Sequence, residues 1–149
     1  MQLIPYEQFA KLRLRDFVPD DTAIGEAADW EWMGSRWHNE GIGFTSFSRH
    51  ASTPDATGGV EISFSELPQD CIERLLNAIG LPVRPGMSIS EVLSVLGSPR
   101  ATRQFVADRH TYEFTAGTPQ PYVVSCTVTD GEGLTYVTVV RPDLVNRDE

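Results

Sequence analysis

The chain contains 149 residues, of which 21 are acidic and 12 are basic, and its formal net charge at neutral pH is -9. This length suits one domain with a substantial core, and a hydrophobic content of 40% excludes a largely disordered chain. Nucleic acid and anionic membrane surfaces are disfavoured as partners, because phosphate groups bind to basic surfaces, and no apolar run reaches the length of a membrane span. The charge favours a basic protein as partner instead, and the other, more usual interpretation is that it serves only solubility.

The first element predicted is a short helix from Tyr6 to Phe17, where apolar residues recur at near-helical spacing after Pro5. A solvated connection is expected from Asp16 to Glu31, which holds six acids and no base. The first residues lack the basic start, apolar stretch and small-residue cleavage site of a signal peptide. On this ground we expect a cytoplasmic protein.

Three tryptophans then fall within eight residues. If they lie on the surface, they and their polar neighbours form a partner-binding hot spot, because Trp and Arg dominate such sites. The candidate partner-binding residues are Trp30, Trp32, Arg36, Trp37, His38 and Glu40. The other interpretation is that the tryptophans close the N-terminal part over the sheet as core, which is the more usual position of large aromatic side chains. The stretch from His38 to Glu40 is expected in a loop.

A half-buried strand over Val60–Phe64 and two amphipathic helices in tandem are predicted next. The first helix runs from Pro68 to Ile79. A link from Gly80 to Gly86 follows, and its two prolines and two glycines turn the chain.

The second helix has the sharpest local pattern in the chain, within Gly86–Pro99. Ser88 and Glu91 have the spacing of a capping box, and Gly97 followed by Pro99 marks the end. The residues expected on its apolar face are Ile89, Val92, Leu93 and Leu96.

After Pro99 the pattern has period two, with strands expected over Thr102–Ala107, His110–Thr115, Tyr122–Thr129 and Leu134–Arg141. Short connections between them predict antiparallel hairpins. The fold class is therefore α+β: two tandem helices packed on an antiparallel meander of about four strands, with an N-terminal helix and an aromatic-rich extension. We expect one domain over 1–149, with residues 1–65 packed as an extension on a helix-helix-meander core over 66–141. Edge strands of the meander can pair between two copies of the chain, so the sequence does not decide between a monomer and a dimer.

The element order and the second helix together resemble the SmpA/OmlA (BamE)-like outer-membrane assembly lipoproteins and the related β-lactamase inhibitory proteins. The resemblance covers about Pro68 to Arg141, and it includes Tyr112, Tyr122 and the Asp130-Gly131 turn. The helix residues that carry it are Gly86, Met87, Ser88, Glu91, Val92, Leu93, Leu96, Gly97 and Pro99. These are caps and core contacts, so the resemblance implies a fold and a protein-binding role, with no catalytic residue.

Neither catalytic nor metal-ligating residues form a recognisable set, and no cofactor is predicted. Cys71 and Cys126 fall on apolar stripes and are expected to be buried and reduced. His110 and Glu113 should lie on opposite faces of a strand, which does not suit a shared metal.

Two functional hypotheses follow. The first is a non-catalytic protein-binding module, in a concrete version an immunity or inhibitor protein that masks a basic partner. The alternative is a small-ligand binder or enzyme with a pocket near Trp30–Glu40. Convergent polar groups around a concave site would distinguish the second from the first.

Overall fold

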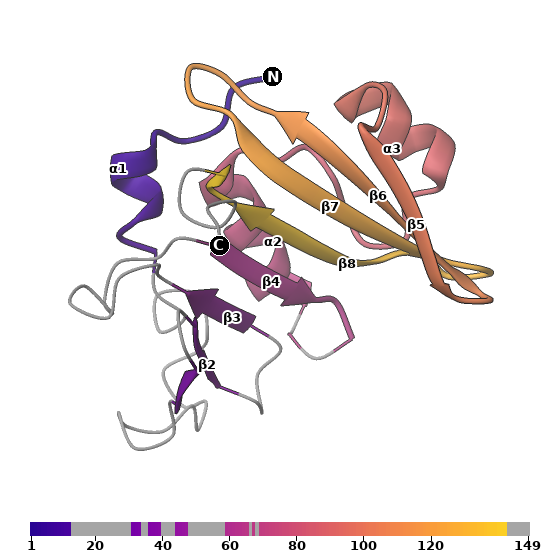
Figure 1. Cartoon of the computed structure of the whole chain (residues 1–149), viewed down its shortest axis with the longest axis horizontal. Helices are drawn as coiled ribbons and strands as arrows, with labels where there is room; N and C mark the ends of the chain where they lie inside the picture. The colour runs from indigo at the N-terminus through magenta and orange to yellow at the C-terminus, as the bar shows by residue number, and fades with distance from the viewer. Residues whose placement is uncertain are drawn as a thin grey trace.

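The computed structural model describes residues 1–12, 31–33, 36–39, 44–47, 59–65, 67 and 69–142 (Figure 1). The elements in chain order are α1 (Tyr6–Phe9), β1 (Glu31–Met33), β2 (Arg36–Asn39), β3 (Phe44–Phe47), β4 (Gly59–Ser63), α2 (Gln69–Ile79), α3 (Ile89–Leu96), β5 (Ala101–Val106), β6 (Arg109–Ala116), β7 (Tyr122–Thr129) and β8 (Gly133–Val140). The predicted α+β class, with helices on an antiparallel meander, is confirmed.

One antiparallel sheet contains all the described strands, in the order β1-β2-β3-β4-β8-β7-β6-β5. The last four strands form the predicted meander, and β8 returns to pair with β4. Strands β1, β2 and β3 then extend the sheet beyond β4. The prediction of a loop at His38 is wrong, since His38 and Asn39 belong to β2. Pairing with β3, which no local pattern reveals, decides the conformation there.

The helix α1 is shorter than predicted, because it ends at Phe9 and the chain turns at Lys11. A helix of four residues has little stability of its own and depends on tertiary contacts. These contacts are aromatic: the ring centroids of Tyr6 and Phe9 lie 5.1 Å and 5.0 Å from that of Tyr122. The predicted continuation from residue 13 to Phe17 and the acidic connection up to residue 30 lie outside the described residues.

The N-terminal segment is attached to the rest of the fold by its backbone. The Leu3 amide donates to the carbonyl of Thr118 at 3.2 Å, and the Ile4 amide donates to the carbonyl of Ile79 at 3.0 Å. The buried Tyr122 hydroxyl donates to the Ile4 carbonyl at 2.6 Å. Residues 1–12 therefore close one end of the core, between the β6–β7 turn and the end of α2.

The core lies between the helices and one face of the sheet. In β7 the predicted alternation is found from Val124 to Thr127: Val124 and Cys126 are fully buried, while Ser125 and Thr127 on the other face are half-buried. It fails at the end of the strand, where Val128 is half-buried and Thr129 is buried, because the β7–β8 register shifts between Thr127 and Val128. The helix α2 buries one face, formed by Cys71, Ile72, Leu75, Leu76 and Ile79. Both cysteines are buried and free, as predicted.

The helix α3 begins as predicted, with a complete capping box. The Ser88 side chain accepts a hydrogen bond from the Glu91 amide at 3.2 Å, and the Glu91 carboxylate accepts one from the Ser88 amide at 2.9 Å. Val92 and Leu96 are buried, but Leu93 is 37% exposed, so its predicted place in the buried face is wrong. A helix of eight residues at the end of the sheet buries only its i, i+4 pair, and Leu93 is rotated by about 100° from Val92.

The link before α3 pairs with the start of β8. The Gly86 amide donates to the Leu134 carbonyl, and the Leu134 amide donates to the Met87 carbonyl, both at 2.9 Å. Gly133 lies so close to the link that a Cβ atom there would be 2.4 Å from the Gly86 carbonyl oxygen. The Gly-Met-Ser sequence thus joins the helical pair to the sheet through backbone contacts. Among the described residues, none of the helices is both long and apolar enough to cross a bilayer.

Candidate binding face

The described helices pack on one of the two faces of the sheet. The core residues of β4, β6, β7 and β8, such as Ile62, Phe114 and Val124, face the helices, and α2 lies behind β4 and β8 in the view of Figure 1. The opposite face, which we call the open face, has half-buried polar side chains and no described helix against it. Its half-buried polar residues are Glu61, Ser63, Thr111, Glu113, Ser125, Thr127, Tyr136 and Thr138. The neighbouring row of the same face contains Val140 and Val123, and Val123 is buried.

Strand register arranges these side chains in two rows across the sheet. Ser63, Tyr136, Thr127 and Thr111 are successive partners in one row. The second row contains Glu61, Thr138, Ser125 and Glu113 in the same order of strands. Alternation along each strand therefore puts eight polar residues on one continuous surface.

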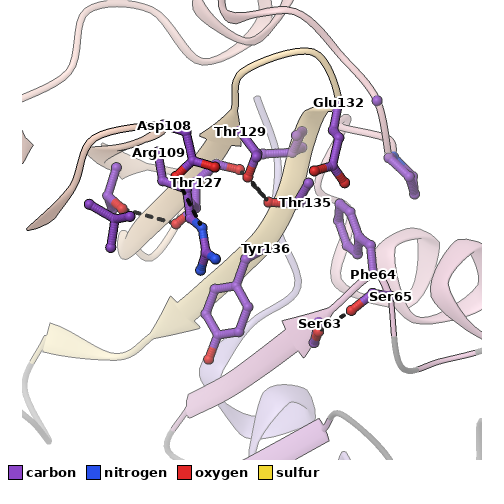
Figure 2. Close-up of a pocket in the computed structure, with 15 residues that line it drawn as sticks. Ser63, Phe64, Ser65, Asp108, Arg109, Thr127, Thr129, Glu132, Thr135 and Tyr136 are labelled. Carbon is purple, nitrogen blue, oxygen red and sulfur yellow. Dashed lines mark hydrogen bonds and ion pairs between the residues drawn. The ribbon is translucent and has the colours of Figure 1, made fainter. Parts of the chain in front are cut away.

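Hydrogen bonds between neighbouring strands fix many of these side chains (Figure 2). The hydroxyl oxygens of Thr111 and Thr127 lie 3.0 Å apart, and the Tyr136 hydroxyl donates to the Glu61 carboxylate at 2.9 Å. Thr129 and Thr135 make a further hydroxyl pair at 2.9 Å. A threonine hydroxyl has one donor and two acceptor sites, so the Thr111–Thr127 pair keeps hydrogen-bonding capacity for a partner.

A hollow of about 660 Å³ lies on the open face, next to the turn between β7 and β8. Figure 2 shows Phe64, Tyr136 and the threonines of β7 and β8 around it. Asp108, Arg109 and Glu132 supply charge at its rim. A β-bulge shifts the β7–β8 register between Thr127 and Val128, at the same place. Bulges bend and twist a strand, which accounts for concavity at this end of the sheet.

Acid-base chemistry is not indicated by the ionisable groups of the core. Burial raises the pKa of the Cys126 thiol to about 12, so this cysteine is protonated at neutral pH and is a poor nucleophile. Burial also raises the pKa of Tyr122 well above its usual value. Within the described part of the chain, no group of three His, Cys, Asp or Glu side chains has the geometry to hold a metal ion.

The predicted partner-binding residues are placed only in part. Trp32 in β1 and Trp37 in β2 are directly opposite in the strand register. His38 is likewise opposite Glu31. The candidates Trp30 and Glu40 lie outside the described residues, and Arg36 is in β2. The structure brings Trp32, Arg36, Trp37 and His38 together on one hairpin, and their role in partner binding stays a prediction.

The hollow contains none of these residues, so it does not lie where the alternative hypothesis placed a pocket, near Trp30–Glu40. The sequence predicted that Ser125 and Thr127 share a face of β7. It did not reveal that β4 lies beside β8, because that pairing joins residues more than 70 positions apart. Only tertiary structure therefore assembles Ser63, Phe64 and Tyr136 around one hollow.

Comparison with known proteins relates one segment of the chain to a protein family. Residues 82–129 match the family model of the outer membrane protein assembly factor BamE domain. The matched segment contains α3, β5, β6 and β7, and it includes the Gly86–Pro99 motif. The resemblance inferred from that motif is thus confirmed over this segment. Neither a curated protein nor a solved structure shows significant similarity to the chain.

This match also bears on role and location. The family is described as a factor in protein assembly, which supports the predicted protein-binding role in its general form. The prediction of a cytoplasmic protein is wrong, because the matched family is one of outer membrane assembly. That prediction depended on the N-terminal residues, which have no part in the caps and core contacts shared with the family.

Proposed function

We propose that this protein is a non-catalytic binding module in outer membrane protein assembly, and that it holds a protein partner on the open face of its sheet. The observation that supports this most directly is the pair of polar rows with a hollow beside them. The hydrophobic core is complete on the helix side of the sheet. No described helix covers the open face, which supports its use for contacts outside the domain.

The composition of this face suits a protein partner. Tyrosine and arginine are enriched at the centre of protein interfaces, and Tyr136 and Arg109 both line the hollow. The hydroxyl pairs fix the side chains before binding, so less conformational entropy is lost when a partner docks. A hollow of about 660 Å³ lies in the range of clefts that hold a drug-sized ligand, so it has room for side chains of the partner.

Charge supports a basic partner. The net charge of -9 attracts basic proteins over distances of about a Debye length, near 10 Å at moderate ionic strength. Two carboxylates, those of Asp108 and Glu132, and one guanidinium, that of Arg109, line the hollow. The Arg109 guanidinium lies 3.8 Å from the Asp108 carboxylate, which offsets part of its charge. An inhibitor or immunity protein that masks a basic partner is the specific version of this proposal.

Site-specific photo-crosslinking in cells tests the open face. A benzophenone side chain at Ser125 or Thr138 should capture the same protein, whereas one at Asn77, on the exposed side of α2, should not. A third position, Arg36 in β2, tests whether the hairpin of β1 and β2, which contains Trp32 and Trp37, contributes to the contact. Identical captures from Asn77 and the open-face positions, or no capture from the open face, would contradict the proposal.

The basic character of the partner has its own test. Asp108→Asn with Glu132→Gln should reduce the crosslinking yield at low salt, and added salt should reduce the wild-type yield toward the same level. If the captured protein is acidic, or if the yield does not respond to salt, the basic-partner proposal fails and the docking proposal stands.

A small ligand in the hollow is the second candidate function. It is favoured by the two aromatic rings of Phe64 and Tyr136 beside several hydroxyls, since ligand sites combine apolar walls with a few polar groups. Phe64→Ala should weaken a small ligand strongly, while a protein spread over both rows should lose little affinity. Ligand-detected NMR on the purified protein separates the two functions.

A further inference from the structure

The strand β5 ends the sheet in the direction away from β4. Its one neighbour among the described strands is β6, so the backbone N–H and C=O groups on its other edge have no described strand to pair with. Its side chains are exposed at Thr102, Arg103 and Gln104, and Val106 is 48% exposed. An exposed edge of this kind is a template for a further strand.

A positive charge lies along this edge of an acidic protein. Arg103 belongs to β5, Arg100 comes immediately before it, and the segment from residue 98 to 107 contains no acid. The Arg100 guanidinium is bonded to the Glu113 carboxylate at 2.6 Å, whereas Arg103 reaches the same carboxylate only at 3.9 Å. With a side chain 56% exposed, Arg103 is the cation that an incoming carboxylate can reach.

The position of Arg103 argues against a second copy of the chain as the added strand. It lies near the centre of β5, which runs from Ala101 to Val106. In an antiparallel β5–β5 pair whose two-fold axis passes near Arg103, the two Arg103 side chains would come close together. Like charges on directly neighbouring positions destabilise strand pairing.

From these observations we propose that an extended acidic segment of the partner protein adds to the sheet along β5 and places a carboxylate beside Arg103. Main-chain hydrogen bonds would supply the affinity, and Arg103 with Val106 would supply the selectivity for acidic and apolar side chains. This inference depends on the proposed protein-binding function and names one mode of contact. A partner that is basic overall satisfies it if one of its strands or tails is acidic.

A synthetic peptide provides the test. The probe is an acetylated, amidated octapeptide in which valine and glutamate alternate, and its control has lysine in place of glutamate. Amide hydrogen exchange of the full chain should show protection of β5 with the acidic probe and at least about tenfold weaker binding of the lysine probe. A strand pairs with its neighbour through every second backbone amide. Of two probes, each N-methylated at one of the two alternating sets of amides, one should no longer bind.

Two variants make the test specific. Arg103→Glu should reverse the preference between the two probes, and Arg103→Gln should reduce binding of the acidic probe without that reversal. Arg84→Glu, in the exposed link before α3, is the matched control and should leave binding of the acidic probe unchanged.

Three results would overturn the inference. One is an absence of β5 protection at millimolar probe. A second is binding that neither N-methylation nor Arg103→Glu alters. The third is protection of β5 by self-association without any probe, seen as a concentration-dependent dimer in sedimentation. Crosslinking from Ser125 and Thr138 does not depend on β5, so a failure here leaves the proposed function to its own test.

Discussion

The contact between Gly133 and the link at Gly86 gives a quantitative test of how the motif joins the sheet. In Gly133→Ala the new Cβ would lie 2.4 Å from the Gly86 carbonyl oxygen and 2.9 Å from that of Met87. Both contacts are with backbone atoms, so a side chain cannot move away to relieve them. The backbone φ at Gly133 is also positive, at 79°.

The expected loss of stability has two parts. A non-glycine residue at positive φ costs about 1 kcal/mol, and this part is shared with Gly131→Ala, where φ is 81° and the space around a Cβ is open. At Gly133 the link must also move away, which breaks its two hydrogen bonds with Leu134 at a cost of about 1 kcal/mol each. The total is about 3 kcal/mol for Gly133→Ala and about 1 kcal/mol for Gly131→Ala.

Urea unfolding followed by circular dichroism measures the free energy of unfolding of both variants and of the wild type, and thermal unfolding measures their Tm. For a domain of this size, each 1 kcal/mol lowers Tm by about 2 to 4 °C, so Gly133→Ala should melt at least about 6 °C below the wild type. Because Gly131→Ala has the same backbone strain without the steric contact, the difference between the variants isolates the link. Equal unfolding free energies for the two, within about 0.5 kcal/mol, would refute the reasoning.

Three further predictions concern single side chains. Ser88→Ala should lower the unfolding free energy by about 1 kcal/mol through loss of the helix cap, while Ser90→Ala, inside the first turn, should change it little; equal losses would contradict the role of the cap. Hydrogen bonds from Ser88 hold the pKa of Glu91 below 4.5, so its contribution is present above that pH and is lost as the pH falls through the lowered value. The stability difference between wild type and Glu91→Gln should therefore shrink in acid, and a constant difference from pH 6 to pH 3 would exclude this linkage. Finally, burial raises the pKa of Cys126 to about 12. In the folded protein at pH 8 this thiol should therefore react with a disulfide reagent at least about tenfold more slowly than in the protein unfolded in urea. A Cys71→Ala background makes Cys126 the one thiol that is measured.

Local patterns predicted the elements whose signals lie within a few residues. The capping box at Ser88 and Glu91, the end of α3 at Gly97 and the alternation in the middle of β7 depend on short spacings, and the structure has all three. The same residues carried the family resemblance, which the BamE-domain match over 82–129 confirms. Errors arose where partners distant in sequence decide the conformation. The helix at Tyr6 ends early, and His38 lies in a strand.

The candidate site shows the same division. That Ser125 and Thr127 face away from Cys126 follows from the sequence alone, because side chains alternate along a strand. That Glu61 and Tyr136 lie beside them follows from the pairing of β4 with β8. The sequence by itself therefore determined the helices with their caps, the meander and the polar character of one sheet face. Only the tertiary structure decided which strands are neighbours, where the hollow lies and which edge is open, because long-range strand pairing has no short-range signal in the chain.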